Sequence, residues 1–92
     1  MKYNVLLYYC YSKIEDVDAY REEHHIFCIE NDLKGRIIIS HEGLNGTVSG
    51  SPEDCEKYMQ YVQEDPRFSH VECKVEQSDL HAFAKLHVRV KP

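Results

Sequence analysis

The segment 35–50, which reads GRIIISHEGLNGTVSG, holds the side chains whose types and spacing come closest to a reactive site. His41 and Glu42 stand between two β-prone runs and lead into a glycine-rich stretch. A histidine titrates near neutrality, so beside a carboxylate it could act as a general acid or base. Neighbours on an extended segment point to opposite faces, however, so the two side chains need not meet the same substrate.

Three other interpretations compete for this segment. The simplest is a hairpin turn in which Gly43, Asn45 and Gly46 adopt positive φ angles. The glycines could instead present backbone N–H groups to a phosphate, although their spacing matches neither the Rossmann nor the P-loop form. A zinc site of the His-Glu-x-x-His type is excluded, because the fifth residue is Asn45 and the segment bridges strands.

The cysteines and the helix histidines give weaker signals. The four cysteines lie at positions 10, 28, 55 and 73 without a Cys-x-x-Cys pair, so we expect reduced thiols packed as small apolar groups. His24 and Cys28 are about one helical turn apart and could reach one metal ion, but two ligands make a poor site. We expect a helix face with a half-buried histidine there, with no metal and no cofactor.

The segment 85–91 alternates between two kinds of side chain. Lys85, His87, Arg89 and Lys91 are separated by aliphatic residues. A strand with this pattern carries a cationic row on one face and an apolar row on the other. The row could contact phosphates, or it could protect a sheet edge against aggregation.

Tyrosine is abundant in this chain, with seven residues in 92. Aromatic side chains exposed on a sheet can stack on single-stranded bases, as in RNA-recognition modules. The Arg/Lys-Gly-Phe/Tyr motif of those modules is absent, and core and sheet packing explains most of the tyrosines.

Length and composition describe one globular domain. The 92 residues are 42% hydrophobic and 29% charged, and the longest apolar runs are far too short to span a bilayer. No signal-peptide cleavage site follows Met1, so we expect a cytoplasmic protein that does not engage a membrane. The net charge of −5 argues against a dedicated nucleic-acid clamp, but all charged residues within 85–92 are basic.

Each expected element has its own signal. The β-prone runs are 3–10, which reads as a fully buried strand, 36–40, 47–49 and 71–75, with 84–90 as a possible fifth. Residues 15–33 show helical periodicity, and Gly35 is expected to end that helix in the left-handed conformation. The second helix begins at Ser51, which can cap it, with Pro52 in the first turn, and it ends before Pro66.

The order β-α-β-β-α-β predicts an α+β, ferredoxin-like sandwich, in which an antiparallel sheet carries two helices on one face. The expected spatial order of the strands is 4-1-3-2. The first two strands run in the same direction in this fold, so the connections that follow them lie at the same end of the sheet. We therefore expect the connection 10–13 beside the turn at 42–46, and any site at that end.

Two groups of residues together resemble a known family. These are Gly35-Arg36 with His41-Glu42-Gly43-Leu44-Asn45-Gly46, and, further along, Phe83, Lys85-Leu86 and Val88-Arg89-Val90-Lys91. They look like the N-terminal, acylphosphatase-like domain of the bacterial rhodanese-containing tRNA uridine hydroxylases, and the likeness covers essentially the whole chain. It implies an acylphosphatase-like fold and a parent oxidoreductase that makes 5-hydroxyuridine at wobble position 34 in an oxygen-dependent reaction.

The resemblance also implies which domain of the parent protein carries the reactive group. In that family a rhodanese domain follows this region and carries the reactive cysteine, and nothing in this chain resembles its cysteine loop. We therefore expect residues 1–92 to be a single N-terminal domain that lacks the rhodanese domain and is inactive alone. The implied partners are tRNA and the rhodanese domain of the same protein. The expected substrate-binding or docking residues, none of them catalytic, are Arg36, His41, Glu42, Asn45, Lys85, Arg89 and Lys91.

Two alternatives stay open. A freestanding acylphosphatase needs an arginine within a glycine-rich loop after the first strand, and the segment 10–14, CYSKI, contains neither residue type. A pure protein-interaction domain would only support its partner. Neutralising Lys85, Arg89 and Lys91 would leave the function of such a domain intact.

Overall fold

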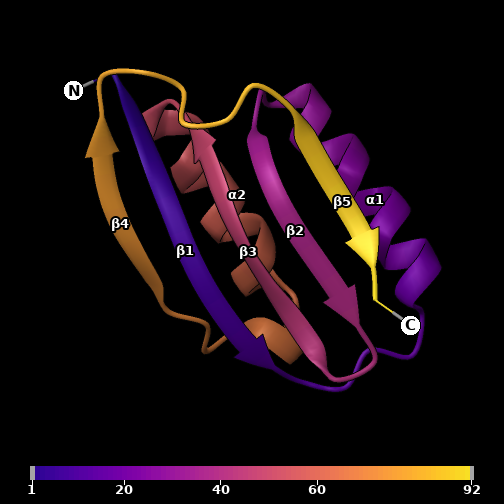
Figure 1. The fold of residues 1–92 in the computed structure, drawn as a ribbon. Coiled ribbons are helices and arrows are strands. Elements are labelled where there is room, and N and C mark those ends of the chain that lie inside the picture. Colours follow the sequence, from indigo (N-terminus) through magenta and orange to yellow (C-terminus); the bar gives the residue numbers. More distant parts are fainter. Residues whose placement is uncertain (1, 92) are drawn as a thin grey trace.

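The computed structural model describes residues 2–91 as one sheet with two α-helices on one of its faces (Figure 1). The strands are β1 (Tyr3–Tyr11), β2 (Lys34–Ser40), β3 (Gly43–Gly50), β4 (Cys73–Ser78) and β5 (Leu86–Val90). The helices are α1 (Val17–Glu30), α2 (Pro52–Glu64) and the short 3-10 helix η1 (Pro66–Phe68). No helix within residues 2–91 is long and apolar enough to cross a membrane.

The strand order is β4-β1-β3-β2-β5, which confirms the predicted 4-1-3-2 arrangement and adds the fifth strand beside β2. The pairs β1–β3, β1–β4 and β2–β3 are antiparallel, whereas β2–β5 is parallel. The sheet is therefore mixed and not purely antiparallel as expected. The reason is visible in Figure 1: the chain leaves β4, crosses one end of the sheet and enters β5 in the direction of β2.

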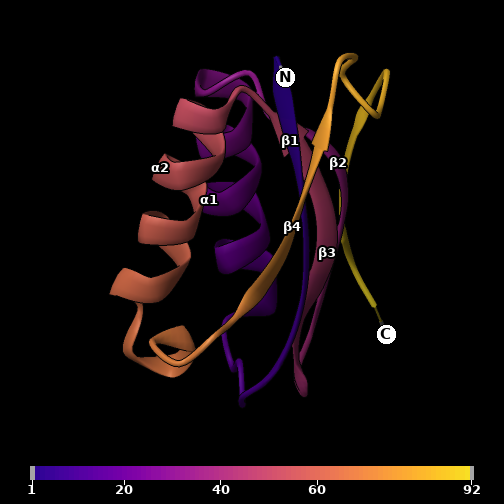
Figure 2. The ribbon, with the colours of Figure 1, turned by 90° about the vertical axis from the view of Figure 1, so that its left-hand side faces the viewer.

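Both helices cover the same face of the sheet, and no helix of residues 2–91 lies on the opposite face (Figure 2). Strand residues alternate between the two faces, so every second side chain enters the core. In β2 these are Ile37 and Ile39, and in β5 it is Val88. Full burial of each such side chain contributes about 2 kcal/mol to the hydrophobic driving force.

A chain of buried polar groups runs through this apolar core. The hydroxyl of Tyr8 on β1 bonds to that of Tyr58 on α2, which lies 2.7 Å from Nε2 of His24 on α1. His24 is fully buried and not half buried as the sequence predicted, because its ring packs against Tyr58 and Tyr61 of α2. Burial raises the pKa of Tyr8 and Tyr58 and lowers the pKa of His24 to about 4.

Helix α1 ends at Glu30, earlier than predicted, and Gly35 does not cap it. Asp32 adopts the left-handed conformation with φ 50°, and its N–H bonds to the carbonyl of Ile29. The N–H of Leu33 bonds to the carbonyl of Cys28, which completes a Schellman motif with Leu33 buried against the core. An aspartate tolerates this conformation because its short polar side chain bonds locally, so no glycine was needed.

Gly35 instead lies inside β2, with φ 139°. A Cβ atom at this position would lie 2.0 Å from the carbonyl oxygen of Thr47 on β3. The glycine therefore permits both the backbone angle and the close approach of β3, which explains its place in the sequence without a helix cap.

The remaining boundaries follow from local bonds. Ser51 caps α2 as predicted, since its Oγ accepts a bond of 3.1 Å from the N–H of Asp54. The expected strand 71–75 begins later, at Cys73, because Val71 still closes η1 through a bond to the carbonyl of Phe68. The four cysteines are free thiols, as expected.

Replacing Gly35 by alanine tests the close approach of β2 and β3. We expect Gly35→Ala to lower the free energy of unfolding by about 3 kcal/mol or more, because the added methyl group meets a backbone oxygen at a positive φ angle. Gly50→Ala is the matched control, since its Cβ would meet only the movable end of the Leu33 side chain. Urea unfolding measures the free energy of unfolding of both variants. Equal losses in the two variants would show that the close approach of β3 does not determine the residue at position 35.

The burial of His24 predicts a pH-dependent stability. Between pH 6.5 and about 4 the unfolded chain binds a proton that the folded chain excludes. The free energy of unfolding is therefore highest above pH 6.5 and falls, by about 3 kcal/mol in total, as the pH decreases toward 4. Urea unfolding at several pH values should show this slope in the original protein and a shallower one in His24→Gln. Asp16 and Asp65, whose pKa values Arg67 lowers from 3.8, titrate below this window. Identical slopes in the original protein and in His24→Gln would refute the assignment of this pH dependence to His24.

Candidate functional site

The helix-free side of the sheet, here called the open sheet face, collects most of the predicted site residues. The alternation that sends Ile37 and Val88 into the core turns their neighbours in sequence toward this face. Its side chains are Tyr9 and Tyr11 of β1, Asn45 and Thr47 of β3, Arg36 and Ile38 of β2, and His87 and Arg89 of β5.

The strand register aligns these side chains in rows. Tyr9 pairs with Asn45, Asn45 with Ile38, and Ile38 with Arg89. Such a row spans three inter-strand steps, or about 14 Å. The N–H of Lys91 bonds to the carbonyl of Ile39, which continues the parallel pairing past the end of β5. Aromatic groups therefore lie at one end of the row and cations at the other.

The cations around β2 and β5 have no carboxylate partners among the described residues. The ion pairs within residues 2–91 involve Lys13, Arg21, Arg67 and Lys74. The basic residues outside those pairs that lie in or beside β2 and β5 are Lys34, Arg36, Lys85, Arg89 and Lys91. Many of the acidic side chains lie on the two helices, so a locally positive surface coexists with a net charge of −5.

Two tyrosines stand out from the first strand, which the sequence analysis had expected to be fully buried. Tyr9 is 63% exposed and Tyr11 is 70% exposed, whereas Tyr8 directly before Tyr9 and Cys10 between the two are buried. The rings of Tyr9 and Tyr11 lie 4.8 Å apart, tilted by 52°. The strict alternation of a strand covered on one face was the signal that could have revealed them.

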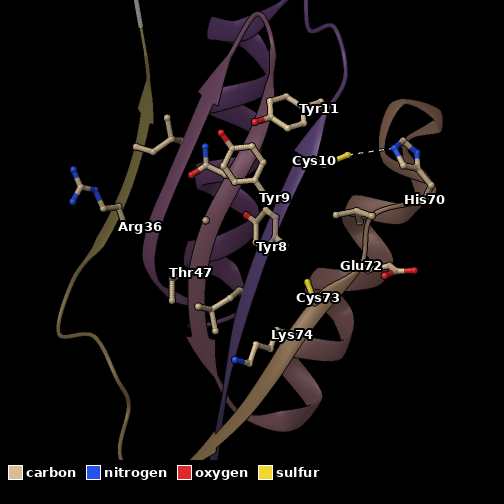
Figure 3. Close-up of a pocket in the computed structure, with 15 residues that line it drawn as sticks. Tyr8, Tyr9, Cys10, Tyr11, Arg36, Thr47, His70, Glu72, Cys73 and Lys74 are labelled. Atoms are coloured by element: carbon tan, nitrogen blue, oxygen red, sulfur yellow. Dashed lines mark hydrogen bonds between the residues drawn. The ribbon is translucent and has the colours of Figure 1, made fainter.

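The tyrosines border two adjoining hollows on the open sheet face. The larger one reaches from Arg36 and Thr47 across β1 to Lys74 (Figure 3). The smaller one, of about 270 Å³, lies against Tyr9, Tyr11 and Lys91. Both are open to solvent and expose aromatic, amide and cationic groups together, a combination suited to a polyanion that carries flat apolar rings.

The His41-Glu42 hairpin lies beside this face and is anchored by hydrogen bonds to residues 12–14. The turn contains only these two residues, since β3 already begins at Gly43. The backbone N–H groups of Ser12 and Ile14 donate to the carbonyls of Glu42 and His41, each at 3.1 Å. Nδ1 of His41 donates to the carbonyl of Ile14 at 2.8 Å. The expected proximity of the two connections is confirmed, and the imidazole is held by backbone and not by Glu42.

The glycines of this segment do not provide positive φ angles, contrary to the hairpin interpretation. Among residues 2–91, positive φ occurs only at Asp32 and Gly35. A Cβ on Gly43 would lie 2.2 Å from the carbonyl oxygen of Cys10, and one on Gly46 would lie 2.8 Å from the hydroxyl of Tyr8. These glycines are explained by the close approach of β1 to β3.

The structure thus separates the predicted residues into groups. Arg36, Asn45 and Arg89 share the open sheet face, and Lys91 continues it. His41 and Glu42 lie at its edge in the anchored turn. Lys85 precedes β5 and is exposed, while its carbonyl accepts a bond from the N–H of Gly35. No group of three or more metal-ligating side chains is found in residues 2–91.

The chain matches a known protein family and curated relatives along nearly its whole length. A family model described as the UPF0176 acylphosphatase-like domain matches residues 3–92. The chain belongs to that family. Curated relatives of this UPF0176 domain named tRNA uridine(34) hydroxylase include proteins from Cytophaga hutchinsonii, 63% identical over 98% of the chain, and Bacillus pumilus, 53% identical over 96%. The resemblance seen in the sequence is confirmed. The chain spans 29% and 27% of the length of these relatives.

Solved structures share the fold of this UPF0176 domain at low identity. The BLUF protein BlrB superposes with a TM-score of 0.81 at 14% identity, covering 97% of this chain and 71% of that one. The BLUF domain of BlrP1 gives 0.79 at 18% identity, with 98% and 64% covered. Full-length HypF gives 0.59 at 16% identity, with 99% and 12% covered. These likenesses support the ferredoxin-like, acylphosphatase-like fold.

The first connection of this UPF0176 domain is poorly suited to acylphosphatase chemistry. A phosphate cradle requires free backbone N–H groups and a guanidinium in this loop. The N–H groups of Ser12 and Ile14 are already bonded to the hairpin, and the segment contains no arginine. The geometry therefore disfavours the freestanding acylphosphatase.

The anchoring role of His41 can be measured directly. We expect His41→Ala to lower the free energy of unfolding by about 1 kcal/mol and to speed amide hydrogen exchange at Ser12 and Ile14, because the imidazole bond to the Ile14 carbonyl is lost. Glu42→Gln is the control and should leave those two amides unchanged in NMR exchange experiments. Unchanged exchange in His41→Ala would show that the backbone bonds hold the turn alone.

Proposed function

We propose that this chain is the N-terminal domain of a tRNA uridine(34) hydroxylase and that its open sheet face contacts the tRNA substrate. The observation that carries the proposal is the set of cations on and beside β2 and β5, which lack carboxylate partners among residues 2–91 and lie on the same face as two exposed tyrosines. The names of the curated relatives support the reaction class. The short share of their length that the chain spans supports a further domain.

The domain's part in such a reaction is to bind and orient the RNA. Arginine and lysine contacts to phosphates fix the position of a nucleic acid without reading its sequence. Lys85, Arg89 and Lys91 supply such contacts in this proposal, together with Arg36. Asn45 offers an amide that can both donate to and accept from a base edge. The oxygen-dependent chemistry belongs to the rhodanese domain expected after this one, for which the rigid His41-Glu42 turn is the proposed docking element.

Salt-dependent RNA binding tests the proposal. We expect the chain to bind an anticodon stem-loop with uridine at position 34, with an affinity that falls steeply as salt increases. The triple substitution Lys85→Gln, Arg89→Gln and Lys91→Gln should weaken binding and reduce the slope of log affinity against log salt by about 2, since three phosphate contacts are lost. Fluorescence anisotropy at several salt concentrations gives both values.

The control carries the same change of charge on other surfaces. Lys2, Lys13 and Lys57 are exposed and lie outside β2 and β5, so the corresponding triple glutamine variant should keep most of the affinity and the salt slope. Equal effects of the two triple variants would leave only a general charge effect and count against a site. No binding at low salt would favour the pure protein-interaction domain.

A further inference from the structure

We propose that the open sheet face binds unpaired nucleotides, with Tyr9 and Tyr11 as the surfaces on which their bases stack. This inference rests on the proposed function and narrows its ligand from tRNA in general to a single-stranded stretch of it. It assigns a binding role to two residues that the sequence analysis attributed to packing.

The exposure of the two tyrosines is the first argument. A tyrosine within a regular strand of a packed domain usually buries most of its ring, yet Tyr9 and Tyr11 are 63% and 70% exposed. Both belong to β1 and pair with β3, Tyr9 with Asn45 and Tyr11 with Gly43, whereas the pairing of β1 with β4 ends at Tyr8. The backbone that carries the rings is therefore ordered by β3 before a ligand binds, which lowers the entropy cost of stacking a base on them.

Ring geometry is the second argument. A tilt of 52° between the two rings prevents them from stacking face to face on each other. Each ring therefore keeps a π-face available to a base. Stacking on aromatic side chains tolerates every base, which suits a surface that also contains few groups able to read base edges.

The charge pattern is the third argument. Phosphates are attracted toward Arg89 and Lys91, at the far end of the rows that begin at the tyrosines. Of the carboxylates that border the hollows, Glu72 lines the larger one, and Glu42 lines the smaller one together with Tyr11 and Lys91, so phosphates are repelled from the Glu42 side of that hollow. A single strand can place its bases on the tyrosines and its backbone along the cations. A duplex cannot, because its bases face inward and stay stacked on one another.

The substitutions that test this proposal separate the aromatic ring from the charge. Tyr9→Leu with Tyr11→Leu removes both rings and keeps apolar side chains, while Tyr9→Phe with Tyr11→Phe keeps the rings and removes only the hydroxyls. The probes are the anticodon stem-loop, a blunt duplex of equal length, and an abasic oligonucleotide with the same number of phosphates. Thermal unfolding confirms that each variant is folded before its affinities are compared.

We expect the double leucine variant to bind the stem-loop at least about tenfold more weakly than the original chain, with an unchanged salt slope and unchanged affinity for the abasic oligonucleotide. The double phenylalanine variant should bind within about twofold of the original chain. The original chain should prefer the stem-loop over the duplex.

Other outcomes overturn the inference in distinguishable ways. If the leucine variant binds the stem-loop normally while the triple glutamine variant does not, stacking is refuted and phosphate binding stands. Equal affinity of the original chain for stem-loop and duplex also refutes it. If the original chain binds none of the three probes at low salt, the proposed function fails together with the inference.

Discussion

A sheet covered by helices on one face only is the constraint on which the rest of this structure depends. Because strand residues alternate, covering one face divides each strand into a buried set and an open set. Ile37, Ile39 and Val88 fill the space beneath the helices, and this leaves Arg36 and Arg89 with no packing role on the opposite face. The pairing that organises the core thereby also sets the spacing of the open sheet face.

Register is consequently the quantity that this domain must control most tightly. A slip of one residue in β1 would bring Tyr9 into the core and expel Tyr8. The bonds that link Tyr8 to Tyr58, and Tyr58 to His24, oppose such a slip because they can form only when Tyr8 points toward the helices. A buried polar chain thus protects the arrangement of a surface on the other side of the sheet.

Charge is distributed unequally between the two sides of the molecule. The helices carry many of the acidic residues, while five of the seven basic residues without a carboxylate partner among residues 2–91 lie in or beside β2 and β5. The outer edge of β5 is itself covered, since the side chain of Arg21 donates from Nε to the carbonyl of Val88 at 2.8 Å. This bond occupies one backbone group of the β5 edge that could otherwise pair with another strand.

Local patterns in the sequence determined the elements and their order. The capping serine at position 51, the alternation over 85–91 and the helical periodicity of 15–33 depend on near neighbours, and each predicted its element with errors only at the ends. The family string around Arg36, His41 and Asn45 indicated the domain family, which the match of residues 3–92 to the family model confirms. Tertiary structure decided the features that depend on distant partners. The close approach of the Thr47 carbonyl explains why a glycine stands at position 35 within β2. The crossover from β4 makes β5 parallel to β2. The helices bury Tyr8 and leave Tyr9 exposed. Sequence spacing defines the two faces of a strand, but only long-range packing determines which face is covered.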